Sequence, residues 1–179
     1  RCGFGPQSSK TNVRYIRKHF MIDKKLFGTI DFYGATEDVT GANFLVQING
    51  KRILVDCGLH QGEQAELDPD SNFGSFPYDP ATIDMLFVTH AHTDHIGKIP
   101  KLVHDGFRGV IYSTPPTKDI SALMFDDAEG LMANEAKEKH LPQMYNKADI
   151  EKTLSLWKVV SYHNHLDIGN DISVQFYDA

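Results

Sequence analysis

Asp84-Met-Leu-Phe-Val-Thr89, followed by His90-Ala-His-Thr-Asp-His95, is the stretch of sequence that decides the fold. Its first half is a short apolar run, which is typical of a strand buried on both faces. Its second half supplies side chains that can bind a metal ion: His90, His92, Asp94 and His95. Imidazole and carboxylate groups suit zinc, and also manganese or iron.

The spacing within this motif points to two metal ions. Residues two apart in an extended segment face the same side, so His90 and His92 direct their imidazoles toward one point. Asp94 and His95 follow where the chain turns into a helix, and this pair can serve a second ion. Two ions roughly 3.5–4 Å apart can generate a hydroxide and hold both oxygens of a displacement. The alternative interpretation is a cluster of surface histidines in a loop.

Asp56 is a second candidate site residue, because it ends a predicted strand at 51–56. A carboxylate there can accept a hydrogen bond from the free ring nitrogen of a ligand histidine and fix its orientation. The alternative is a strand-end aspartate that binds loop amides. We interpret Cys57 as a small buried residue. Gly58 and Gly62 either let backbone approach a metal-bound substrate or are ordinary turn glycines.

The remaining pattern predicts an α/β layered fold. Asn49-Gly50 predicts a type I′ hairpin turn, and Gly169-Asn170 a second turn. Residues 57–80 are expected to form a long loop, and Pro100 weakens the first helix. The predicted strands are 28–33, 43–48, 51–56, 84–89, 109–112, 159–162 and 172–177, and the predicted helices are 96–103, 115–139 and 147–157.

The charge distribution divides the chain into a basic head and an acidic body. The net charge is -6, yet residues 1–26 contain Asp23 as the single acid beside seven basic residues: Arg1, Lys10, Arg14, Arg17, Lys18, Lys24 and Lys25. We therefore expect 27–179 to be the domain and 1–26 to be a basic N-terminal segment. This segment is either a solvated tail or sequence foreign to the domain, which we favour, or an arm that binds nucleic acid. An acidic body argues against broad, non-specific nucleic-acid binding.

Composition restricts the cellular setting. No apolar run is long enough to span a bilayer, so no membrane partner is expected. Cys2 and Cys57 are too few for a disulfide framework, which makes a reducing, cytoplasmic location the prediction. Whether the chain forms a homo-oligomer is left open.

Other polar residues are interpreted as structural. His60, in the loop after Asp56, faces either the cleft or the surface, and we favour the surface. We expect His163 and His165 in a solvated turn without an acidic partner. The solvent-exposed face of the long helix is expected to include Asp126, Asp127 and Glu129. His104 and His140 lie near predicted helix ends, where a cation is favourable.

Three segments together resemble one protein family. They are 32–45 (FYGATEDVTGANFL), 53–62 (ILVDCGLHQG) and 88–97 (VTHAHTDHIG). The His-x-His-x-Asp-His core alone fits the whole metallo-β-lactamase superfamily. The run from Gly34 to Gly41 beside Asp56 resembles its β-CASP group more narrowly, which includes RNA 3′-end processing endonucleases and bacterial and archaeal RNases.

This resemblance implies an αββα layered sandwich and a two-zinc ribonuclease. Asp56 would orient a ligand, His90 and His92 would bind one Zn²⁺, and Asp94 and His95 the other. Asp94 would also lie near the attacking water, so Asp94 and Asp56 are the expected catalytic residues and RNA the expected substrate. In the family, a Gly-His follows a segment like the one ending at Ala179 and supplies a further ligand. The expectation is therefore the N-terminal portion of such a domain, truncated before the third metal-binding motif, and close to inactive by itself.

Two other classes of function remain open. One is a different hydrolase of the same fold, such as a DNA nuclease or a thioesterase. The other is a non-catalytic subunit that keeps the fold as an interaction module, against which the intact motif argues.

Overall fold

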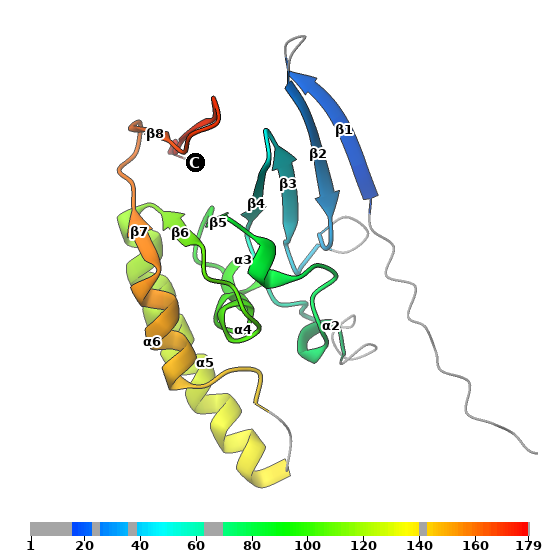
Figure 1. Cartoon of the computed structure of the whole chain (residues 1–179). Helices are drawn as coiled ribbons and strands as arrows, with labels where there is room; N and C mark the ends of the chain where they lie inside the picture. The colour runs from blue at the N-terminus through cyan, green and yellow to red at the C-terminus, as the bar shows by residue number, and fades with distance from the viewer. Residues whose placement is uncertain (1–15, 23–25, 36–38, 63–69, 140–142, 179) are drawn as a thin grey trace, which may run out of the picture.

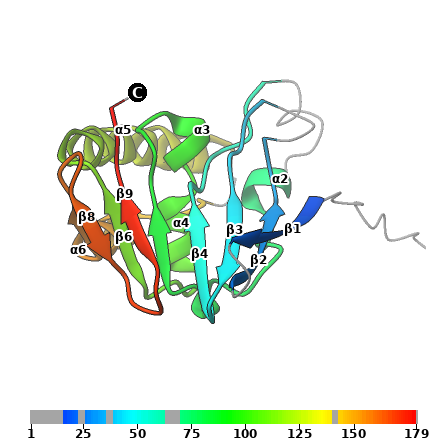
Figure 2. The same cartoon turned by 90° about the horizontal axis from the view of Figure 1, so that it is seen from above.

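The chain folds around one mixed sheet with helices on one face and a small hairpin on the other (Figures 1 and 2). The computed structural model describes residues 16–22, 26–35, 39–62, 70–139 and 143–178. Seven strands pair in chain order from β1 to β7, and β8 pairs with β9 in a separate two-stranded sheet. The strands are β1 Ile16–Ile22, β2 Leu26–Phe32, β3 Phe44–Ile48, β4 Lys51–Val55, β5 Met85–Phe87, β6 Val110–Ser113, β7 Trp157–Val159, β8 His165–Asp167 and β9 Ser173–Gln175.

The main sheet changes direction at β4. Strands β1 to β4 form an antiparallel meander, whereas β4 to β7 run parallel. Asn49 and Gly50 connect β3 to β4 with φ values of 48° and 77°, as the predicted type I′ turn requires. Strand β1 pairs with β2 from Ile16 to Ile22, so part of the basic head lies in the sheet. The division at residue 27 stays a prediction.

Alternation along the strands produces two cores, one on each face of the sheet. On the helical face, Leu54 and Leu86 belong to a buried cluster with residues of the helices. On the opposite face, Ile53, Met85 and Phe87 form a cluster with partly buried hydrophobics of the β8–β9 hairpin. Figure 2 shows the hairpin in front of the sheet and α4 and α5 behind it. The central strands are therefore covered on both sides, as their continuous apolar sequence predicts.

One helix, α5, is long, and the others are short. The helices are α2 Asp70–Phe73, α3 Thr93–Ile96, α4 Ile99–His104, α5 Pro115–Lys139 and α6 Lys147–Ser155, with a 3₁₀ turn η1 at Pro80–Thr82. Helix α5 buries Ser121 and Phe125 and exposes Leu123 and Leu131. Helix α6 begins with a capping box between Asn146 and Asp149. Among the described residues, no helix combines the length and apolar character needed to cross a membrane.

The α/β architecture is confirmed, and the differences are local. The predicted helix 96–103 is two helices, and Pro100 lies in the first turn of α4, where its missing N–H costs nothing. The expected loop 57–80 contains α2 and the start of η1. The strand predicted at 159–162 lies at 157–159, and β8 was not predicted, because three residues with an exposed–half-buried–exposed pattern carry little periodic signal.

Candidate metal centre

The motif residues gather at the carboxyl ends of the parallel strands, the usual position of sites in such sheets. Asp56 follows β4, and Thr89 and His90 follow β5 shortly after Phe87. Asp94 and His95 lie on α3, the short helix next along the chain (Figure 1). Asp56 adopts a φ of 60°, a left-handed conformation that aspartate tolerates better than most residues.

Asp56 is the centre of a hydrogen-bond network. The residue is 1% exposed, and its Oδ1 accepts a 2.8 Å hydrogen bond from the backbone N–H of Thr89. Its Oδ2 lies 2.8 Å from Thr89 Oγ1 and 2.8 Å from His95 Nδ1. Thr89 Oγ1 also lies 2.9 Å from His90 Nδ1. One buried carboxylate therefore contacts His95 directly and His90 through a hydroxyl.

The outer ring nitrogens form two donor pairs. His90 Nε2 lies 3.1 Å from His92 Nδ1, and His95 Nε2 lies 3.6 Å from Asp94 Oδ2. Two ligands at about 2.0–2.1 Å from a tetrahedral zinc are separated by about 3.3–3.4 Å, so both pairs fit one ion each. Among the residues that the structure describes, no group of three or more His, Cys, Asp or Glu side chains surrounds a single point. Each pair therefore offers two candidate metal ligands, one fewer than the three usual at a catalytic zinc.

Backbone hydrogen bonds hold the Asp94–His95 segment in place. The carbonyl of Asp94 accepts from Ala42 N at 2.9 Å, and that of His95 accepts from Cys57 N at 2.8 Å. Gly58 lies against the same segment: a Cβ there would be 1.6 Å from the Asp94 carbonyl oxygen. The close approach that Gly58 permits is therefore between two protein segments. Gly62, by contrast, has a φ of 70° and nothing within 4 Å of a Cβ, as in an ordinary turn.

Burial controls the protonation of two groups near the network. Desolvation, followed by the nearby imidazoles of His95 and His92, lowers the pKa of His90 below 6.5. A neutral imidazole is the form that binds metal. Burial also raises the pKa of the Cys57 thiol to about 12, in keeping with a small buried residue. Asn43 Nδ2 lies 3.8 Å from its sulfur and donates to Tyr78 Oη at 2.9 Å.

Three interpretations of other polar residues need correction. His60 is half-buried, with its ring against Gly41, and its backbone exchanges two hydrogen bonds with Asn72. His163 is exposed as expected but has an acidic partner, Asp178 Oδ2, at 2.8 Å. Glu129 is 8% exposed, because its position faces the buried side of α5. Asp126 and Asp127 are exposed, as predicted, and His140 lies outside the described residues.

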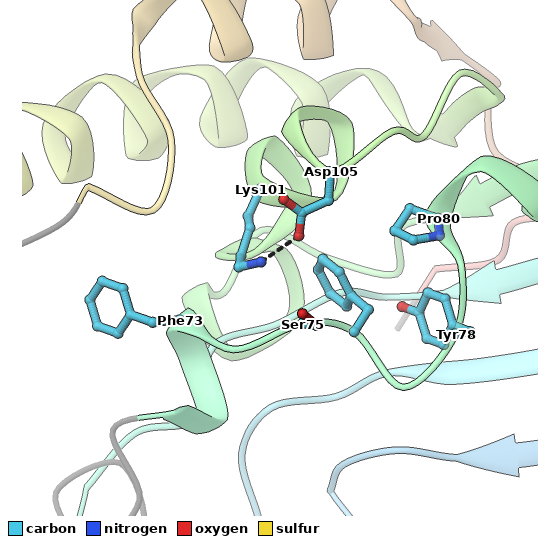
Figure 3. A pocket seen from close by; sticks show the side chains of 7 residues that line it. Phe73, Ser75, Tyr78, Pro80, Lys101 and Asp105 are labelled. Carbon is cyan, nitrogen blue, oxygen red and sulfur yellow. Dashed lines mark hydrogen bonds and ion pairs between the residues drawn. The ribbon is translucent and has the colours of Figure 1, made fainter.

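Thr89 is the site residue that the sequence interpretation missed. The available signal was its position: Thr89 lies at the end of a buried apolar run and directly precedes His90. A pocket of about 410 Å³ on the outer side of α4 is separate from this network. Figure 3 shows its lining, in which Lys101 pairs with Asp105. The Lys101 ammonium also lies over the Phe76 ring, 4.9 Å from its centroid.

Comparison with known proteins finds a matching family model and similar relatives. Residues 37–160 match the family model described as the metallo-beta-lactamase superfamily. The chain is 32% identical over 137 residues to Ribonuclease TTHA0252 of Thermus thermophilus, covering 76% of this chain and 29% of that protein. It is 34% identical over 151 residues to Transcription termination factor FttA of Methanosarcina mazei, covering 82% of this chain and 22% of that protein.

The matched relatives are β-CASP RNA-processing nucleases, which confirms the resemblance seen in the sequence. The chain spans about a quarter of their length. Among solved structures, MEM-A1, a subclass B3 metallo-beta-lactamase from a soil metagenome library, aligns with 15% identity and a TM-score of 0.46. That alignment covers 82% of this chain and 48% of the lactamase.

Proposed function

The chain belongs to the metallo-β-lactamase superfamily, and from that premise we propose that it is part of a zinc-dependent ribonuclease acting in RNA processing or decay. The observation that carries the proposal is the pair of donor sets held by one buried carboxylate. Sequence similarity to a named ribonuclease supports the choice of RNA. A cytoplasmic location remains part of the proposal.

Each site residue has a separate role in this proposal. His90 and His92 would hold one Zn²⁺, and Asp94 and His95 a second. When bound, two such ions supply a hydroxide nucleophile and neutralise charge on a phosphodiester. Asp94, whose side chain is 22% exposed, can accept a hydrogen bond from an approaching water. Asp56, which is closed off from solvent, orients His95 and is an acceptor only.

The test is RNA cleavage with metal analysis of the full-length protein. We expect two zinc ions per chain, cleavage of a radiolabelled single-stranded RNA, and loss of both after chelation. His92→Ala should abolish cleavage, whereas His163→Ala, which removes an exposed histidine outside the site, should not. Two tightly held ions without RNA cleavage, but with hydrolysis of DNA or of a thioester, would favour the other hydrolases of this fold. Absence of metal would favour a non-catalytic subunit.

Residues 1–179 alone are a separate arm of this test. Because each donor pair offers two ligands, we propose that this segment binds metal weakly and cleaves RNA at or near background. Robust metal-dependent cleavage by the segment would contradict this part of the proposal.

A further inference from the structure

The Thr89 hydroxyl lies between the Asp56 carboxylate, which accepts hydrogen bonds, and the His90 imidazole, which can donate or accept. Its Oγ1 lies 2.8 Å from Asp56 Oδ2 and 2.9 Å from His90 Nδ1. A carboxylate oxygen only accepts, so the hydroxyl hydrogen points to Asp56. The lone pairs of Oγ1 then face His90, whose Nδ1 must carry a hydrogen to make a favourable contact. This assigns the proton of neutral His90 to Nδ1 and leaves Nε2 bare toward His92.

Asp56 Oδ2 also fixes the tautomer of His95. Its Nδ1 lies 2.8 Å from Asp56 Oδ2, which again requires the hydrogen on Nδ1 and leaves Nε2 directed to Asp94. The backbone N–H of Thr89 binds the other carboxylate oxygen, Oδ1, at 2.8 Å. The position of Asp56 therefore does not depend on the threonine hydroxyl alone.

We propose that Thr89 is a positioning residue that fixes the tautomer of His90 and joins the two donor pairs into one hydrogen-bonded unit through Asp56. The inference rests on the proposed metal-binding function for its consequence, although the tautomer itself is a property of the metal-free protein. Replacing such an outer hydrogen-bond partner usually lowers metal affinity by about 10–100-fold.

Thr89→Val is the informative change, because valine keeps the shape and the backbone N–H and removes only the hydroxyl. The first measurement is long-range ¹H–¹⁵N NMR of the imidazoles in metal-free full-length protein at about pH 8, above the ordinary histidine pKa of about 6.5. We expect His90 to be the Nδ1–H tautomer in the natural protein and a mixture in Thr89→Val, with His95 unchanged. Thr89→Ser should retain the natural tautomer. An unchanged His90 tautomer in Thr89→Val would overturn the proposal.

The second measurement is zinc affinity by competition with a chromophoric chelator. Thr89→Val should weaken one of two ions by about 10–100-fold and leave the other close to its natural affinity, whereas Asp56→Asn should weaken both. Natural affinity for both ions in Thr89→Val would overturn the proposal. If the natural protein binds no zinc, the proposed function fails, and the NMR result still decides the role of Thr89. Thr89→Ala serves both measurements in place of Thr89→Val if the valine variant does not fold.

Discussion

At the scale of single residues, the site depends on a buried carboxylate, Asp56, which would destabilise the fold without its hydrogen-bond donors. Asp56 is buried and left-handed at φ 60°, and an isolated buried carboxylate is strongly unfavourable. Three donors offset that cost: the N–H and hydroxyl of Thr89 and Nδ1 of His95. The sequence predicted that Asp56 would contact a ligand histidine, but it could not predict which one, because the choice depends on how α3 turns.

Gly58→Ala should destabilise the protein by at least about 3 kcal/mol, the upper end of overpacking effects. The added Cβ would lie 1.6 Å from the Asp94 carbonyl oxygen and 2.6 Å from the His95 nitrogen, and neither backbone atom can move without breaking its hydrogen bonds. Urea unfolding measures the effect.

The matched control is Gly130→Ala in α5, where a Cβ meets nothing within 4 Å. This change should stabilise the protein by about 0.5–1 kcal/mol, because glycine is a poor residue in a helix interior. Equal effects from both substitutions would show that the close packing at Gly58 is wrong.

Cys57 should be inert to alkylation in the folded protein. Its pKa of about 12 leaves a thiolate fraction on the order of 10⁻⁴ at about pH 8, and only the thiolate reacts. Iodoacetamide labelling followed by peptide mass spectrometry should find Cys57 unmodified in buffer and fully modified in denaturing urea. Rapid labelling of Cys57 under native conditions would contradict its burial.

At the scale of elements, alternation and apolar runs carried most of the prediction. The central strands and α5 were found within a residue or two because burial on fixed faces leaves a period of 2 or 3.6 in the sequence. Strand β8 and helix α2 are too short for such a period. Their positions depend on contacts across the fold, such as the packing of the β8–β9 hairpin on Phe87.

Two turns at the same end of the molecule hold this hairpin against the sheet. Asn49 Nδ2 donates to the carbonyl of Asn170, and Asn170 Nδ2 donates to that of Asn49, both at 2.7 Å. Asn170→Gly, which keeps the positive φ of 56° accessible, should cost about 1 kcal/mol. Hydrogen exchange should then accelerate in β8 and β9 and stay unchanged in β5. Asn49→Gly removes the other side-chain bond to a backbone carbonyl and should accelerate exchange in the same two strands. Unchanged exchange in both variants would contradict these bonds.

The two sides of α5 should respond differently to truncation. Phe125 is 1% exposed and packs near Trp157, with ring centroids 6.2 Å apart, so Phe125→Ala should cost about 3–5 kcal/mol. Leu123 is 72% exposed, and Leu123→Ala should change the free energy of unfolding by less than about 0.5 kcal/mol. Thermal denaturation of both variants provides the comparison, and a large loss in Leu123→Ala would show that this face is covered.

At the scale of the whole molecule, the sheet places the ends of β4 and β5 and the start of α3 at one edge, and these carry all the candidate ligands. The sequence predicted His90, His92, Asp94 and His95 as two pairs, because a motif within six residues depends little on the rest of the fold. It could not predict Thr89 as the connection between the pairs, because Asp56 approaches from 33 residues earlier in the chain. The sequence therefore predicted the ligands within the motif, whereas the contact between Asp56 and Thr89 required the structure.

Metal binding should therefore stabilise the molecule as a whole. A ligand that binds only the folded state adds about 2.7 kcal/mol to the free energy of unfolding when its concentration is 100 times its Kd. Zinc should bind the folded chain and not the unfolded one. The Asp94–His95 pair is held near the His90–His92 pair by α3 and by the hydrogen bonds to Ala42 and Cys57. Thermal unfolding with zinc at a fixed multiple of its measured Kd should show this gain. Asp94→Asn should require more zinc for the same gain, whereas His163→Ala, which removes a surface imidazole paired with Asp178, should need the natural amount. An equal zinc requirement in both variants would mean that the ion binds elsewhere and that the motif does not hold it.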